Sequence, residues 1–121
     1  METQAYNVYA QNCPTRLLLD RISNKWSMLI LGRLAKGKVR FNQLRREIEG
    51  ISQKVLSQTL KNLERDGLIV REAFPTVPVT VEYSITELGS TLSDTVNMLK
   101  RWAESHYEEV LASQNAYDGR N

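Results

Sequence analysis

The sequence has few of the residues that form covalent or metal cross-links. Its 121 residues contain one cysteine, Cys13, and one histidine, His106. A single thiol excludes a disulfide within the chain, and the two residues together cannot form a cysteine and histidine metal site within one chain. A site shared between subunits, or one built from carboxylates, is not excluded. A glycine-rich phosphate loop and a nucleophile with a neighbouring base are also missing, so we expect neither an enzyme nor a cofactor.

Long apolar runs are missing as well. No segment approaches the roughly 18 consecutive apolar residues that a membrane-spanning helix needs. Residues 1–12 contain neither a basic cluster nor an apolar run, so they do not resemble an export signal. We therefore expect a cytoplasmic protein without a membrane partner. With 41% hydrophobic and 25% charged residues, the composition is that of an ordinary globular domain.

Acidic residues are absent from one long segment. Between Arg21 and Arg46 the chain has eight basic residues and no acidic one, whereas seven acidic and three basic residues follow from Glu82 onward. The net charge of +2 does not reveal this separation. The basic segment suits a polyanion such as nucleic acid. A basic run alone is more often a solvated helix face. The order of the predicted helices and strands therefore has to decide whether this segment binds nucleic acid.

The spacing of apolar residues predicts a mainly helical α+β fold. Four helices are expected before residue 67, and each begins at a proline or a capping residue: Pro14, Ser23 or Asn24, Asn42, and Ser52. Extended runs at 68–74 and 79–85 flank a loop with two prolines and predict a two-stranded β-hairpin. A long helix capped by Thr86 should then run to about Ala112. This divides the chain into an N-terminal arm (1–12), one domain (13–112) and a polar tail (113–121).

The third and fourth predicted helices have the lengths of a helix-turn-helix. On the fourth, residues 53–66, leucines fall on one side and amide, amine and hydroxyl groups on the other. Such groups can hydrogen-bond to base edges in the major groove, whereas a polar outer face alone is about equally typical of an ordinary surface helix. Three helices, a tight turn and a hairpin in this order favour a winged helix that binds double-stranded DNA. The predicted contacts here are Ser52, Gln53, Lys54, Ser57, Gln58 and Lys61.

Further DNA contacts are expected on either side of this helix. The segment before it should contact phosphates, which give affinity but no direct sequence information. The hairpin loop, residues 75–78, contains no lysine or arginine, so the wing should add little specificity. The predicted contacts are Arg40, Asn42, Gln43, Arg45, Arg46, Arg71 and Thr76.

Several stretches resemble the HxlR-type family, a MarR-like group of bacterial winged helix-turn-helix regulators. They are Cys13-Pro14, residues 23–34, 40–45, 50–56, 63–72, Pro78 with 81–89, and Trp102. The resemblance covers most of the chain and implies a dimeric DNA-binding regulator of transcription. In such proteins the first and last helices commonly form the dimer interface. Some members sense quinones, aldehydes or oxidants through a thiol that matches Cys13.

The last predicted helix supports a homodimer independently. It carries a near-heptad apolar strip through Leu92 and Leu99, and a second strip with Met98 and Trp102. One strip can pack on its own domain and the other needs a partner, unless both are buried in one subunit. The fourth helices of the two subunits would then lie about 34 Å apart and read a pseudo-palindromic operator. The expected interface is Leu17, Leu18, Leu92, Val96, Leu99, Trp102 and Ala103.

Cys13 is a candidate redox sensor. It precedes Pro14 at a predicted helix N-terminus, where the helix dipole favours the thiolate, and Arg16 lies about one turn on. An oxidant or small electrophile could then change DNA affinity through a Cys13–Cys13 disulfide between subunits or a mixed disulfide. An inert, half-buried capping cysteine remains the alternative.

Two other functions stay open. The winged helix could serve only for protein contacts, in which case DNA binding would be weak and nearly independent of salt. Alternatively, a small aromatic effector could bind between Trp26, Tyr83, Met98 and Trp102, although these side chains are more typical of a core.

Overall fold

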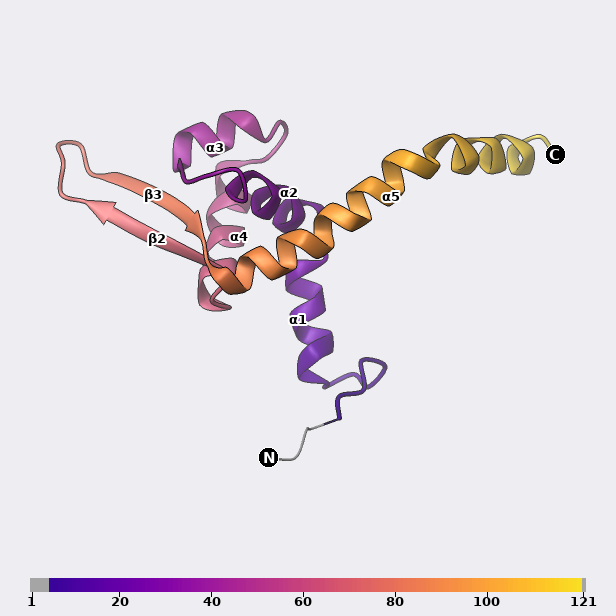
Figure 1. Ribbon diagram of the computed structural model, residues 1–121, viewed down its shortest axis with the longest axis horizontal. Coiled ribbons are helices and arrows are strands. Elements are labelled where there is room, and N and C mark those ends of the chain that lie inside the picture. Colours follow the sequence, from indigo (N-terminus) through magenta and orange to yellow (C-terminus); the bar gives the residue numbers. More distant parts are fainter. Residues whose placement is uncertain (1–4, 121) are drawn as a thin grey trace.

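The computed structural model describes residues 5–120, which form five helices and a three-stranded antiparallel sheet arranged as a winged helix (Figure 1). Helices α2, α3 and α4 form the body, and the β2–β3 hairpin projects from it as the wing. Helices α1 and α5 leave the body in different directions. The elements are α1 (Pro14–Ile22), α2 (Lys25–Leu34), β1 (Val39–Arg40), α3 (Phe41–Glu47), α4 (Gln53–Arg65), β2 (Ile69–Phe74), β3 (Thr80–Ile85) and α5 (Glu87–Asp118).

The core lies where α2, α3 and α4 meet the base of the sheet. Leu56, Leu60 and Leu63 of α4 are at most 1% exposed. Their spacing of four and three residues places them on one helix face, so the opposite face of α4 has to point away from the core. Burial of each such side chain contributes about 2–3 kcal/mol, which holds α4 at a defined rotation. The other fully buried aliphatic side chains are Ile30, Leu31, Leu34 and Leu44.

Three of the predicted helix caps are confirmed. The side-chain oxygens of Asn24, Ser52 and Thr86 accept hydrogen bonds from the backbone N–H groups three residues on, at 2.9–3.1 Å. The predicted cap at Asn42 is wrong, because α3 begins at Phe41 and its N-cap residue is Arg40. Val39 and Arg40 pair with β3 as a short strand, so the backbone stays extended up to Arg40 and turns helical directly after it.

Two features differ from the predicted elements. The sheet has the order β1-β3-β2, so a third strand joins the expected hairpin. Two residues are too few to show the alternation that identifies a strand in a sequence. Helix α5 continues to Asp118, so residues 113–118 are helical and the predicted end near Ala112 is wrong. These residues include no proline or glycine that would end a helix, and Gly119 is the C-cap.

Candidate nucleic-acid interface

The face of α4 opposite the core is polar and open. Gln53, Lys54, Gln58 and Lys61 are exposed, and Ser57 is partly exposed. The whole face lies on one regular helix, so these side chains form a continuous row. Val55 is 36% exposed, which adds one aliphatic side chain beside the row.

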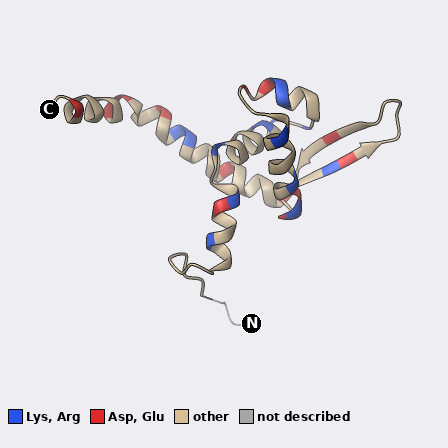
Figure 2. Cartoon of the chain, turned by 180° about the vertical axis from the view of Figure 1, so that it is seen from behind, with Lys and Arg blue, Asp and Glu red and all other residues tan. Residues whose placement is uncertain are grey.

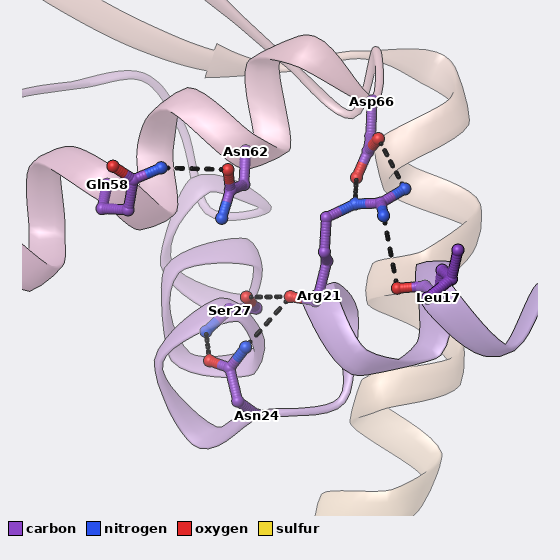
Figure 3. A network of polar contacts seen from close by, with 7 residues as sticks. All are labelled: Leu17, Arg21, Asn24, Ser27, Gln58, Asn62 and Asp66. Carbon is purple, nitrogen blue, oxygen red and sulfur yellow. Dashed lines mark hydrogen bonds and ion pairs between the residues drawn. The ribbon is translucent and has the colours of Figure 1, made fainter. Parts of the chain in front are cut away.

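The two glutamines on this face present different groups outward. Arg45 Nη1 donates to Gln53 Oε1 at 3.4 Å, across the turn from α3 to α4. A guanidinium group only donates, so the Gln53 oxygen is used and its amide N–H groups remain available. Gln58 Nε2 donates to Asn62 Oδ1 at 3.2 Å, one turn along α4 (Figure 3). The carbonyl oxygen of Gln58 is therefore the group left to accept.

Two surface hollows flank the row. One is lined by Asn42, Arg45, Arg46 and Ile51, at the turn between α3 and α4. It has two guanidinium groups at its rim, which suits a phosphate. The other lies between α4 and the wing, and it brings three predicted contacts together: Ser57, Lys61 and Arg71, with Glu64 and Tyr83 beside them. The Glu64 carboxylate lowers the positive charge of this second hollow.

Several basic residues of the 21–46 segment have acidic partners instead of facing a polyanion. Arg21 pairs with Asp66 at 2.9 Å, and Arg33 with Glu47 at 2.5 Å. The Arg33 hydrogen bond lowers the pKa of Glu47, and a weaker contribution comes from Gln43, which donates to the same carboxylate at 3.3 Å. Figure 2 shows acidic residues in red as well as basic residues in blue on the body.

Two predicted phosphate contacts, Arg40 and Gln43, therefore already have partners within the chain. Arg40 lies 3.9 Å from Glu82 on the neighbouring strand, although its side chain is 66% exposed and can leave this weak pair. Gln43 is held by Glu47. The positive surface is narrower than the run of eight basic residues predicts, because Arg21, Arg33 and Arg40 all have carboxylate neighbours.

The wing loop is closed by its own hydrogen bonds. Thr76 Oγ1 donates to the Pro78 carbonyl at 2.8 Å and lies 2.8 Å from Thr80 Oγ1. The predicted phosphate contact through Thr76 is therefore unsupported, since its hydroxyl proton is already used. Val77 is fully exposed at the tip, and Figure 2 shows no charged residue on the loop. The wing offers an apolar tip in place of a cation.

The apolar strips of α5 divide along the length of the helix. Near its start, Gly89 and Ser93 are buried and Leu92 packs against the core of its own chain, so Leu92 is a core residue more than an interface residue. Farther on, both strips are open: Leu99 of the first strip is 56% exposed, and Met98 and Trp102 of the second are 69% and 55% exposed. The expectation that one strip packs on its own domain is confirmed only at the start of α5, at Leu92, because the rest of the helix extends past the body (Figure 1).

The remaining predicted interface residues lie on open surfaces of α1 and α5. Helix α1 has no buried residue, and its Leu17 is 49% exposed. Leu18 and Val96 are partly exposed, whereas Leu99 and Ala103 are exposed. In one chain these two helices thus leave apolar side chains without cover.

The four aromatic and methionine side chains do not line one cavity. Tyr83 is 8% exposed and belongs to the core, against which Trp26 packs. Met98 and Trp102 lie on the open part of α5, where Trp102 stacks on His106 with ring centroids 4.9 Å apart. The alternative of an aromatic effector pocket is therefore not supported within a single chain, because α5 diverges from the body.

Cys13 occupies the N-cap position of α1, as predicted, with 7% exposure. Its Sγ lies 3.0 Å from Thr15 Oγ1. This hydrogen bond is the main reason that the pKa of the thiol is lowered, with help from the backbone N–H groups of Arg16 and Thr15 and opposition from burial. The guanidinium of Arg16 instead donates to the Tyr9 carbonyl at 3.1 Å. Arg16 therefore lowers the pKa of the Cys13 thiol through its backbone N–H group and not, as expected, through the charge of its guanidinium.

The chain has a three-helix body around a buried core, in which α4 follows a tight turn and has an open polar face, and a β-hairpin follows it. These features define the winged-helix class of transcriptional regulators. The chain belongs to the HxlR-like helix-turn-helix family, whose model matches residues 21–111. It is a transcriptional regulator with a helix-turn-helix and is not an enzyme. None of the helices within residues 5–120 has both the length and the apolar character needed to span a membrane.

Known relatives agree with this assignment. The chain is 46% identical to an uncharacterized HTH-type transcriptional regulator, YtfH of Escherichia coli K12, over 106 residues that cover 88% of this chain and 84% of the relative. A solved structure of the regulator ytfH from Salmonella typhimurium is 42% identical, with a TM-score of 0.87, over 92% of this chain and 99% of that one. The redox regulator HypR in its oxidized form is 43% identical, with a TM-score of 0.70, over 77% of this chain and 96% of that one.

Proposed function

We propose that this protein binds a pseudo-palindromic DNA operator as a homodimer, with α4 of each subunit in the major groove. The observation that carries the proposal is the orientation of α4. Its leucines are buried and its row of Gln53, Lys54, Ser57, Gln58 and Lys61 faces outward. A row of donors and acceptors on a rigid helix, without a carboxylate in its first half, is what base edges and phosphates require.

The hydrogen bonds of α4 indicate which base edges it prefers. Gln53 has its oxygen bound by Arg45, so it should donate to the O6 or N7 atoms of guanine or to O4 of thymine. Gln58 presents its oxygen and should accept from the amino group of cytosine or adenine. Arg45 and Arg46 would bind phosphates beside this helix, since both line the hollow at the turn.

The open apolar surfaces of α1 and α5 support the dimer. Leu17, Leu99 and Trp102 are each about half exposed in one chain, and a twofold partner would cover them. A dimer would place two α4 helices about 34 Å apart, one helical turn of DNA.

Selection from a random duplex library, followed by footprinting at several salt concentrations, tests DNA binding. We expect protection of two half-sites one turn apart, and affinity that falls by orders of magnitude between about 50 and 200 mM salt if roughly 6–10 phosphates are contacted. Lys54→Ala should reduce both the affinity and the salt dependence, whereas Lys100→Ala on α5 should change neither. Weak binding with no salt dependence would instead favour a winged helix used for protein contacts.

We further propose that Cys13 senses thiol-reactive compounds. HypR is described as a redox regulator, and the pKa of Cys13 is lowered, so more of its reactive thiolate exists at neutral pH. The thiolate would attack a small disulfide, forming a mixed disulfide on Cys13 and releasing the other half as a thiolate. A bulky group on Cys13, which is 7% exposed, would then displace the start of α1.

The pH dependence of Cys13 alkylation tests this chemistry. Alkylation by iodoacetamide should rise with pH to a midpoint below the ordinary thiol pKa, because the Thr15 hydrogen bond stabilises the thiolate. Thr15→Val should move the midpoint upward, and the control Thr91→Val on α5 should not; mass spectrometry measures both. A midpoint that Thr15→Val leaves in place would contradict the proposed cause. Cys13→Ser should abolish any effect of diamide on DNA binding, and a retained response would remove Cys13 from the mechanism.

A further inference from the structure

One polar network joins the end of α1 to the ends of two other helices (Figure 3). Arg21, in the last turn of α1, donates through Nε and Nη2 to both carboxylate oxygens of Asp66 at 2.9 and 3.1 Å. Its Nη1 donates to the Leu17 carbonyl at 3.3 Å, which fixes the side chain along α1. Asp66 is the C-cap residue of α4, so the pair connects α1, which the proposed function places at the dimer interface, directly to α4.

The backbone of Arg21 is held as firmly as its side chain. Its carbonyl accepts from Ser27 Oγ at 2.7 Å and from Asn24 Nδ2 at 3.0 Å. Asn24 also caps α2, and Ser27 is 1% exposed within that helix. The end of α1 is therefore tied to α2 by its main chain and to α4 by its guanidinium. Both attachments have defined geometry, because a bidentate pair fixes direction as well as distance.

Asp66 does not stabilise α4 by itself. A carboxylate at a helix C-terminus is unfavourable beside the negative end of the helix dipole. The side chain is also only 13% exposed, which makes an unpaired charge costly. Arg21 offsets both effects, and Asp66 correspondingly raises the pKa of the Arg21 guanidinium. Arg21 is therefore committed to a partner within the chain, although it begins the basic segment that the sequence assigns to a polyanion.

We infer that Arg21 and Asp66 are positioning residues that set the direction of α4 relative to α1, and thereby the half-site spacing that the dimer accepts. The inference rests on the proposed function, since it requires α1 at the dimer interface and α4 on DNA. Helix α1 has no fully buried residue, and Ile22 at its last position packs against the core, so apolar packing acts at its end and places little constraint on its angle to the body. The pair supplies that constraint at a point 45 residues away in the sequence.

The test compares the spacer preference of the full-length protein with that of Arg21→Gln and Asp66→Asn. The probe is the selected duplex, with its two half-sites moved apart or together in single base pairs, each of which rotates one site by about 35°. We expect the wild type to prefer one spacing by about tenfold or more, and both variants to prefer it by less than about threefold. The contacted bases within each half-site should stay the same, because α4 keeps its outward face.

Two further variants separate positioning from general stability. Arg16→Gln removes an equal charge from the same helix, where the Arg16 guanidinium donates to the Tyr9 carbonyl, and should keep the wild-type spacer preference. The exchanged pair Arg21→Asp with Asp66→Arg should restore much of the preference. It also provides a folded protein if a single variant proves unstable by circular dichroism.

The outcomes distinguish the positioning role of Arg21 and Asp66 from the proposal of a dimeric operator. Variants that lose stability but keep the sharp wild-type preference would overturn the positioning role while leaving the operator proposal intact. A wild type that binds one half-site as well as two would contradict the dimeric operator, and this inference with it. A flattened preference that the exchanged pair restores would support it.

Discussion

Gly89→Ala should lower the free energy of unfolding by at least about 2 kcal/mol, although alanine is the better helix former by about 1 kcal/mol. A Cβ atom on Gly89 would lie 2.0 Å from the Leu68 carbonyl oxygen and 2.8 Å from Ile85 Cγ1. That carbonyl oxygen also accepts a hydrogen bond from the Thr86 backbone, so it cannot move without breaking the junction between β2 and α5. Urea unfolding at a fixed protein concentration measures the change.

Gly32→Ala is the matched control for this prediction. Gly32 also lies within a helix, α2, but a Cβ atom there would have no neighbour within 4 Å. We expect it to be neutral or to stabilise the protein by up to about 1 kcal/mol, through helix propensity alone. Gly89→Ala and Gly32→Ala should thus differ in sign. Equal stabilisation by both would show that α5 does not pack so closely on Leu68 and Ile85.

Leu99→Glu combined with Trp102→Glu should convert the protein to a monomer. Both side chains are more than half exposed in one chain, so the charges should leave the fold of each subunit intact. In a dimer they would be buried against the partner, where an unpaired carboxylate is costly. Loss of the second half-site should weaken operator binding about 100-fold or more, because the two contacts no longer reinforce one another. Analytical ultracentrifugation and gel shifts measure the two effects.

Asn97→Glu provides the control on the same helix. It adds one negative charge, half of what the double variant adds, to the exposed, opposite side of α5 and should alter neither oligomeric state nor operator affinity. If Leu99→Glu with Trp102→Glu leaves the protein dimeric, the interface lies elsewhere. The open end of α5 would then need another explanation.

The order of elements and the orientation of α4 could be predicted from the sequence because both depend on local periodicity. Leu56, Leu60 and Leu63 repeat at helical spacing, and Ser52 and Thr86 identify the helix starts by the hydrogen bonds their hydroxyls can make. The polar residues between the leucines must then face outward. These signals need no knowledge of distant contacts.

The features that the sequence did not reveal depend on long-range contacts. Arg21 looks like one more cation in a basic segment until Asp66 is placed beside it. The tight contact at Gly89 appears only when α5 packs on Leu68, although the resemblance of residues 81–89 to the HxlR-type family already included this glycine. Likewise, Leu92 and Trp102 share an apolar pattern, and only the departure of α5 from the body separates core from open surface.

Cleavage of DNA from a reagent attached to α4 tests the central claim most directly. With Cys13→Ser as background, Ser57→Cys carries an iron chelate that cuts nearby DNA, and Ser113→Cys near the far end of α5 serves as control. We predict cuts from position 57 in two major-groove patches about 10 base pairs apart, and none above background from position 113. Cuts of equal strength from both positions, or none from position 57 on DNA that the protein still binds, would contradict the placement of α4 in the groove.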